Sequence, residues 1–171
     1  MLIRPEATTD HAAVRAIHTA AFETPAEARL VDALRARARP LVSLVAVAGD
    51  LVHDPVVGHI LFSPVTLTDH PDLQLLGLAP MAVAPGSQRQ GIGSALVREG
   101  LEACRRLGTG AVVVLGHPEY YPRFGFEPSV RFGIDSEYDV PPEVFMALEL
   151  RTGYLQDVSG TVRYHEAFQE L

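Results

Sequence analysis

The sequence predicts a mixed α/β fold in a single domain over residues 1–171. Three observations lead to this prediction. Between residues 41 and 83, three runs rich in Val and Leu are separated by short turns, as in an antiparallel meander. Apolar residues then recur at helical spacing over residues 91–107. The stretch 111–115 is wholly apolar, which is typical of a strand covered on both faces.

The first forty residues are predicted to form one strand and two helices. They are a strand over residues 2–6, an amphipathic helix over 9–22 and a helix from Pro25 that Pro40 ends. Thr8, Thr9 and Asp10 offer the side-chain oxygens that cap a helix N-terminus. In the second helix, apolar residues line one face and charged residues lie mainly on the other, which we expect to be solvated.

The remaining strands are predicted at residues 41–48, 56–67, 73–83, 111–115, 145–150 and 161–164, with a mobile-looking stretch at 129–142. Pro80 lacks an N–H group for a sheet ladder, so irregular pairing is expected around it. Strand, glycine loop, helix and strand follow one another from 75 to 116. This order predicts a right-handed crossover that joins two parallel strands.

Composition narrows the class of function. The net charge of −7 argues against a broad nucleic-acid or anionic-membrane surface. Every basic residue is arginine, which excludes a lysine nucleophile or Schiff base. The single cysteine, Cys104, suits a reducing cytoplasm, and no signal peptide or membrane span is expected. The seven histidines show no zinc-binding pattern, so no metal site is predicted.

The loop before the helix of residues 91–107 carries the strongest functional signal. Gly91 and Gly93 lie where a loop becomes a helix N-terminus, which presents free N–H groups and the positive end of the helix dipole. Such a site binds phosphate, and Arg89 adds positive charge. A P-loop is excluded because the chain has no lysine. A dinucleotide fingerprint is excluded because Leu96 replaces its third glycine.

Two motifs then identify a family. The run Gln88-x-x-Gly91-x-Gly93, preceded by Met81-Ala82-Val83-Ala84-Pro85, closely resembles the acetyl-CoA-binding motif of the GCN5-related N-acetyltransferases. Downstream, Tyr120-Tyr121-Pro122-Arg123-Phe124-Gly125-Phe126 is similar to the family's aromatic signature after its fifth strand. In detail the chain looks most like a small bacterial branch with a Gly-His-Ile-x-Phe-Ser strand, here Gly58 to Ser63.

The resemblance implies an N-acetyltransferase with acetyl-CoA as co-substrate and a mostly antiparallel sheet with one splayed parallel pair. Backbone groups of Met81, Ala82 and Val83 would pair with the pantetheine arm. The pyrophosphate would bind the loop formed by Gln88, Arg89, Gln90, Gly91, Ile92, Gly93 and Ser94. Tyr121 matches the position of the general acid, and we expect Tyr120 to belong to the core.

Other roles stay open at this stage. The strand at 73–83 has no acidic residue, so the general base is His59, His117, Glu119 or a water chain. Ser63 is a candidate for the acceptor pocket. The first two helices and the segment 129–142 are expected to build that pocket, and they hold Glu23, Glu27, Asp135, Glu137 and Asp139, although such acids are more typical of a solvated surface. The acceptor is a primary amine of a small molecule or a protein, and a homodimer is open. The alternative function is a non-catalytic acyl-CoA-binding or regulatory module.

Overall fold

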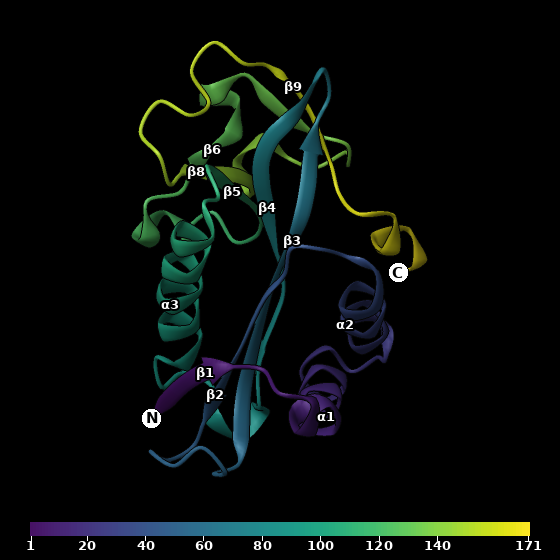
Figure 1. Ribbon diagram of the computed structural model, residues 1–171, viewed down its shortest axis with the longest axis vertical. Helices are drawn as coiled ribbons and strands as arrows, with labels where there is room; N and C mark the ends of the chain where they lie inside the picture. The colour runs from purple at the N-terminus through teal and green to yellow at the C-terminus, as the bar shows by residue number, and fades with distance from the viewer.

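The computed structural model describes residues 1–171, in which a nine-stranded sheet lies between helices on its two faces (Figure 1). The helices are α1 (His11–Phe22), α2 (Ala26–Arg37) and α3 (Ile92–Leu107). The strands are β1 (Leu2–Pro5), β2 (Val42–Val47), β3 (Val56–Leu67), β4 (His70–Val83), β5 (Ala111–Leu115), β6 (Glu127–Pro128), β7 (Ile134–Ser136), β8 (Phe145–Glu149) and β9 (Gly160–Arg163).

The sheet has the order β1-β2-β3-β4-β5-β8-β6, and β9 pairs with both β3 and β7. Strands β2, β3 and β4 form the predicted antiparallel meander, and β4 and β5 form the predicted parallel pair. The expectation of a mobile stretch at 129–142 is wrong in part. Residues 134–136 form β7, whose partner β9 lies about 25 residues further along the chain, out of reach of a local sequence pattern.

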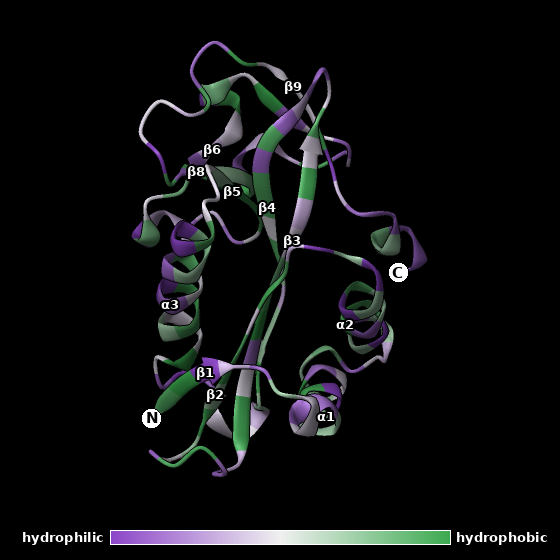
Figure 2. Ribbon diagram, viewed as in Figure 1, coloured by the Kyte–Doolittle hydropathy of each residue, from purple (hydrophilic) through white to green (hydrophobic).

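Two apolar cores lie on opposite faces of the sheet. One contains Val14 and Leu34 of α1 and α2, and the other contains Leu96 and Cys104 of α3. Figure 2 shows the hydrophilic residues of α3 on the side turned away from the sheet. Alternate residues of β5 belong to the two cores, so this strand is covered on both faces, as its apolar sequence predicts.

The charged face predicted for the second helix is only partly solvated. Arg35 of α2 is half-buried and donates to the Glu6 carboxylate over 2.6 Å. It also donates to Asp32 over 2.8 Å. Helical periodicity shows which residues share a face, whereas the position of Glu6 beside that face is set by the packing of the chain that follows β1.

The parallel pairing of β4 and β5 is short. Only Leu75–Gly77 pair with Ala111–Val113, whereas β4 continues to Val83. On its other edge, β4 stays paired with β3 through Val83, with a register shift between Ile60 and Phe62. The two parallel strands therefore diverge after Gly77, and the second half of β4 has one edge that no strand covers.

Candidate active site

The diverging strands place a free backbone edge at the centre of the molecule. Met81, Ala82 and Val83 pair with Ile60, His59 and Gly58 of β3 on one edge only. Unpaired N–H and C=O groups of a strand edge bind an extended chain by adding it as a further strand. An amide-containing arm of a ligand can therefore lie between β4 and β5 at this place.

The loop that follows β4 has free amides. Gly91 is the N-cap of α3 in the left-handed conformation, with φ of 83°, which glycine adopts without strain. The backbone N–H groups of Gln88, Arg89, Gln90 and Gly91 donate to no backbone acceptor. The first turn of α3 contributes further amides that lack a partner in the helix. Free amides at a helix N-terminus are groups that can bind an anion.

A hollow of about 310 Å³ lies over these amides, and we call it the loop pocket. It is lined by Val83, Ser87, Gln88, Arg89, Gly91, Ile92, Gly93, Ser94, Tyr120 and Arg123. Two of these side chains are arginines and none is acidic, so the pocket favours an anion. The Arg123 guanidinium lies 4.5 Å from the centre of the Tyr120 ring, which orients its charge.

Seven of the ten residues predicted to bind the cofactor line the loop pocket, and three do not. Met81 lines a different pocket, Ala82 is buried, and Gln90 is exposed beside the loop. Sequence reasoning missed Ser87, Tyr120 and Arg123 at this pocket. Arg123 and Tyr120 come from the turn after β5, and only the fold brings that turn beside the N-terminus of α3.

The two adjacent tyrosines have different surroundings from those expected. Tyr120 is half-buried and packs against the edge of the core on the α3 side, and its hydroxyl lies 3.1 Å from Ser94 Oγ. Tyr121, which begins the turn η3 (Tyr121–Phe124), is buried instead. Burial and the neighbouring Tyr120 raise the pKa of Tyr121 to about 12, so its hydroxyl stays protonated near neutral pH. A Cβ on Gly116 would lie only 2.2 Å from Cε2 of the Tyr121 ring, so the ring packs in the space that the glycine leaves open.

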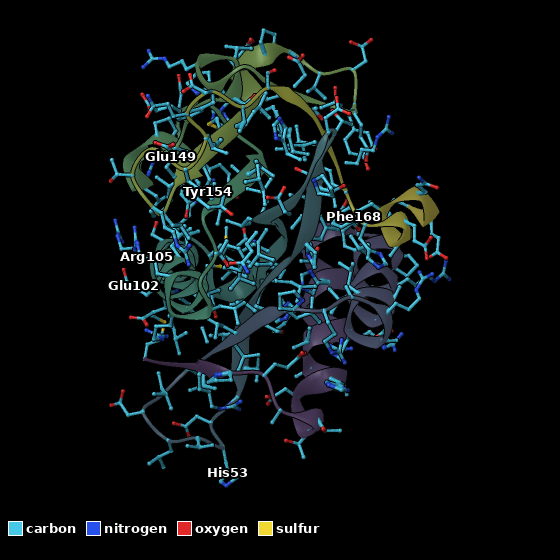
Figure 3. The ribbon with its side chains drawn as sticks, turned by 45° about the horizontal axis from the view of Figure 1, so that its top comes forward. His53, Glu102, Arg105, Glu149, Tyr154 and Phe168 are labelled. Atoms are coloured by element: carbon cyan, nitrogen blue, oxygen red, sulfur yellow. The ribbon has the colours of Figure 1, made fainter.

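A second hollow of about 310 Å³ lies where β4 and β5 diverge, and we call it the strand-gap pocket. It is lined by Phe22, Glu27, Leu30, Leu78, Ala79, Pro80, Met81, Leu115, Tyr121, Phe168 and Leu171. Figure 3 shows Phe168 on the C-terminal turn, which is the element η6 (Glu166–Glu170) beside α2. Tyr121 and the free edge of β4 therefore face a largely apolar space closed by helices from the other end of the chain.

Four of the candidate groups for proton transfer or acceptor binding, His59, Ser63, His117 and Glu119, do not line this pocket. His59 is fully buried and both of its ring nitrogens have partners, so it does not reach a substrate. Ser63 is also fully buried and has no hydrogen-bond partner, and the expectation that it lines the acceptor pocket is wrong. His117 is exposed, and its Nδ1 accepts from the Glu119 N–H over 3.2 Å. Neither His117 nor Glu119 lines the strand-gap pocket.

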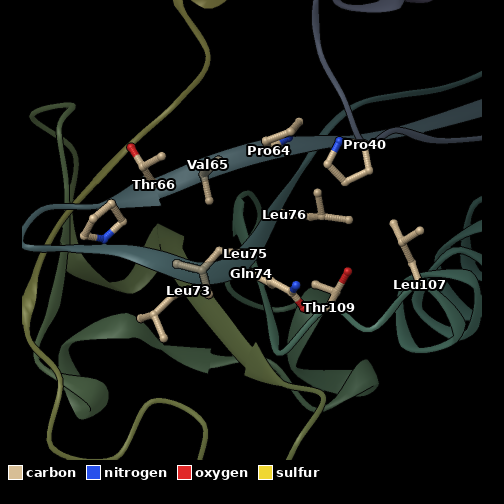
Figure 4. Close-up of a pocket in the computed structure, with 11 residues that line it drawn as sticks. Pro40, Pro64, Val65, Thr66, Leu73, Gln74, Leu75, Leu76, Leu107 and Thr109 are labelled. Atoms are coloured by element: carbon tan, nitrogen blue, oxygen red, sulfur yellow. The ribbon is translucent and has the colours of Figure 1, made fainter.

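A third hollow, of about 320 Å³, lies between the β3–β4 hairpin and the C-terminal end of α3 (Figure 4). Its lining includes Pro40, Pro64 and Leu107 and has no charged side chain. Its lining includes neither the loop residues nor Tyr121, so this hollow is not part of the candidate site although its volume is similar. No group of three or more His, Cys, Asp or Glu side chains is placed to hold a metal ion. No helix is both long enough and apolar enough to cross a membrane.

A loop with free amides, a free strand edge and a buried tyrosine beside an apolar pocket are the features expected of an acyl-CoA-dependent transferase. The family model of the acetyltransferase (GNAT) domain matches residues 42–128, and the chain belongs to this family. The family and the fold that the two motifs indicated are thereby confirmed, and the protein is an enzyme of the acetyltransferase class.

Relatives cover the whole chain. It is 38% identical over 171 residues, all of both chains, to the uncharacterised N-acetyltransferase YhbS of Escherichia coli K12. The structure of a GNAT family N-acetyltransferase (YhbS) from Escherichia coli in complex with CoA has a TM-score of 0.89 and 36% identity, and the match covers 98% of this chain and 91% of that one. A GNAT family acetyltransferase from Brucella melitensis, in complex with acetyl-CoA, has a TM-score of 0.78 and 36% identity, with 98% and 97% covered.

Proposed function

We propose that this protein transfers the acetyl group of acetyl-CoA to a primary amine by direct attack of the amine on the thioester. Acetyl-CoA is the co-substrate, its pyrophosphate bound at the loop pocket and its pantetheine arm along the free edge of β4. The observation that carries the proposal is the set of unpaired loop amides beside two arginines and no carboxylate. Residues 1–171 act as one domain, and the free thiol of Cys104 supports a cytoplasmic location.

The site supports the arm and the phosphates with different groups. Backbone N–H and C=O groups of Met81, Ala82 and Val83 supply strand-like hydrogen bonds to the arm, and one N–H polarises the thioester oxygen. An N–H group directed at a developing oxyanion contributes on the order of 3–4 kcal/mol. Gln88, Arg89, Gln90 and the first turn of α3 hold the pyrophosphate by amides and charge. The Gln88 side chain donates to the Val83 carbonyl over 3.1 Å, which ties the loop to the end of β4.

The reaction balances with one proton released. An alkylammonium has a pKa of about 10.4, so only about one molecule in 2,500 is neutral at pH 7. The ammonium group must therefore first lose a proton to solvent. The amine nitrogen bonds to the acetyl carbon, and the carbon–sulfur bond then breaks with its electron pair on sulfur. Tyr121 donates its proton to the departing thiolate as general acid and regains one from the nitrogen of the product. The products are the acetamide and the free thiol of CoA.

Delivery of the free amine is a water-mediated step in this proposal. The buried His59 is out of reach, and no histidine lines the strand-gap pocket. Supplying the neutral amine at pH 7 costs about 4–5 kcal/mol. His117 and Glu119 remain candidates for a water chain from the exposed side.

Two measurements test the proposal. Calorimetric titration with acetyl-CoA should give saturable binding, and the substitution Arg123→Ala should weaken it. Addition of an amine panel should release free CoA thiol at a rate that depends on the amine. Absence of acetyl-CoA binding would overturn the proposal, whereas binding without thiol release for any amine would point to the non-catalytic acyl-CoA-binding module.

A further inference from the structure

We propose that the acceptor is a small monoamine with an apolar body, and that the carboxylate of Glu27 binds its ammonium group before transfer. The inference rests on the proposed function, because it names the substrate of the same site. It follows from the lining of the strand-gap pocket, whose charged side chain is Glu27 alone.

The wall of the pocket fits an apolar body. Nine of its eleven lining residues are hydrophobic. Three are aromatic, Phe22, Tyr121 and Phe168, and they come from α1, η3 and η6. Aromatic faces attract both apolar groups and ammonium groups. A volume of about 310 Å³ is at the small end of ligand pockets, which indicates a small molecule rather than a long polymer side chain with its backbone.

Glu27 lines the same pocket as this apolar wall. It lies in the first turn of α2, where the positive end of the helix dipole stabilises a carboxylate. The Thr24 hydroxyl donates to Oε2 over 3.3 Å, which leaves the other oxygen free to accept from an ammonium group. Because Glu27 and Tyr121 line the same pocket, an amine bound at the carboxylate lies in the space that Tyr121 also faces.

The same lining sets what the site rejects. An amino acid with a free carboxylate would bring a second negative charge into an apolar space that contains no basic side chain. A polyamine would bring further ammonium groups, for which the lining offers no second acidic side chain. Both classes lose affinity relative to a monoamine because charges without a partner are costly to remove from water.

The experiment compares three acceptors of related size: 2-phenylethylamine, phenylalanine and spermidine. Thiol release is followed at saturating acetyl-CoA for the unmodified enzyme. The expected result is a kcat/KM for 2-phenylethylamine at least about tenfold above those for the other two, as one lost charged hydrogen bond predicts. A preference for phenylalanine or spermidine would overturn the inference and leave the proposed function intact.

Variants test the role of Glu27 directly. Glu27→Gln should raise the KM for 2-phenylethylamine at least about tenfold, with the affinity for acetyl-CoA unchanged. Glu27→Asp should restore part of the loss because it keeps the charge. Glu99→Gln, the same change at an exposed position of α3, is the matched control and should behave as the unmodified enzyme. An unchanged KM in Glu27→Gln contradicts the inference, and failure of the unmodified enzyme to bind acetyl-CoA contradicts the proposed function as well.

Discussion

His18 Nε2 and His59 Nδ1 lie 2.8 Å apart, in a hydrogen bond between two fully buried rings. From His59 the chain continues through its Nε2 to Ser43 Oγ at 2.8 Å, and Ser43 donates to the Glu6 carboxylate over 3.0 Å. A carboxylate only accepts, so Ser43 must accept from His59 and His59 must accept from His18. His59 is therefore neutral with its proton on Nε2, and His18 also carries a proton on Nε2, while its buried Nδ1 has no partner.

The row of hydrogen bonds from His18 to Glu6 predicts that the protein loses stability in mild acid. Burial, with Arg35 nearby, lowers the pKa of His18 from 6.5 to about 4, and burial and the neighbouring His18 lower the pKa of His59 in the same direction. As pH falls below 6.5, the unfolded chain takes up protons that the folded chain does not. The free energy of unfolding should therefore fall by about 3 kcal/mol between pH 6.5 and 4 from His18 alone. Urea denaturation across this range measures the loss.

Asp10 titrates below this range, and two substitutions provide the comparison. Arg4 lowers the pKa of Asp10, whose stabilising ion pair is lost only as pH falls below its ordinary value of 3.8. His18→Gln keeps a side-chain N–H donor but cannot be protonated, so the pH dependence should become shallower. His53→Gln, at an exposed position, should leave it unchanged. Equal slopes in the two variants would show that the buried pair does not govern acid stability.

Two strand serines, the half-buried Ser43 and the buried Ser63, should respond differently to removal of the hydroxyl. Ser43→Ala leaves the His59 N–H without its acceptor, which should lower the free energy of unfolding by about 1–3 kcal/mol. Ser63→Ala removes a buried hydroxyl that has no partner, so it should be neutral or slightly stabilising. Denaturation of both variants at pH 7 tests this contrast, and equal losses would refute it.

Gly93→Ala should separate cofactor binding from folding. A Cβ at Gly93 would meet its nearest atom, Tyr120 Oη, at 3.4 Å, which is an ordinary contact, so stability should not fall. The added methyl group projects beside the loop amides and should raise the Kd for acetyl-CoA at least about tenfold. In Gly86→Ala the Cβ has no atom within 4 Å, and both stability and affinity should be kept. Calorimetry and thermal denaturation report the two quantities, and unchanged affinity in Gly93→Ala would place the pyrophosphate elsewhere.

The adjacent tyrosines should affect different kinetic constants. Tyr121→Phe keeps the ring and removes the hydroxyl, so kcat should fall about 100-fold or more while the Kd for acetyl-CoA holds. Tyr120→Phe removes the hydrogen bond to Ser94 beside the loop pocket, so it should weaken acetyl-CoA binding more than it lowers kcat. Single-turnover rates and binding titrations distinguish the two effects. The reverse pattern would make Tyr120 the proton donor.

The turnover rate should rise with pH and should show no decrease caused by ionisation of Tyr121. Because the pKa of Tyr121 is raised to about 12, its proton is available throughout the range in which the enzyme is folded. Activity should increase with pH as more of the amine becomes neutral, up to the limit set by unfolding. A falling limb near pH 10 that disappears in Tyr121→Phe would contradict this assignment.

The sequence by itself determined the order of the elements and the identity of the loop. Alternation and apolar runs are local properties, so β3 and β5 begin and end where their patterns do, at 56–67 and 111–115. Gly91 adopts the left-handed conformation that glycine takes without strain, so the turn before α3 is a local property of the sequence.

Only the tertiary structure decided which side chains face the site. The turn after β5 has no periodic pattern, so its sequence does not show that Tyr120 lines the loop pocket and Tyr121 the strand-gap pocket. Glu27 resembles any solvated acid of a helix until α2 and η6 close the strand-gap pocket around it. His18 and His59 are 41 residues apart, and their contact exists because α1 packs on β3. The spacing of apolar residues shows which face of a helix or strand is buried, whereas the residues that pack against that face depend on long-range packing.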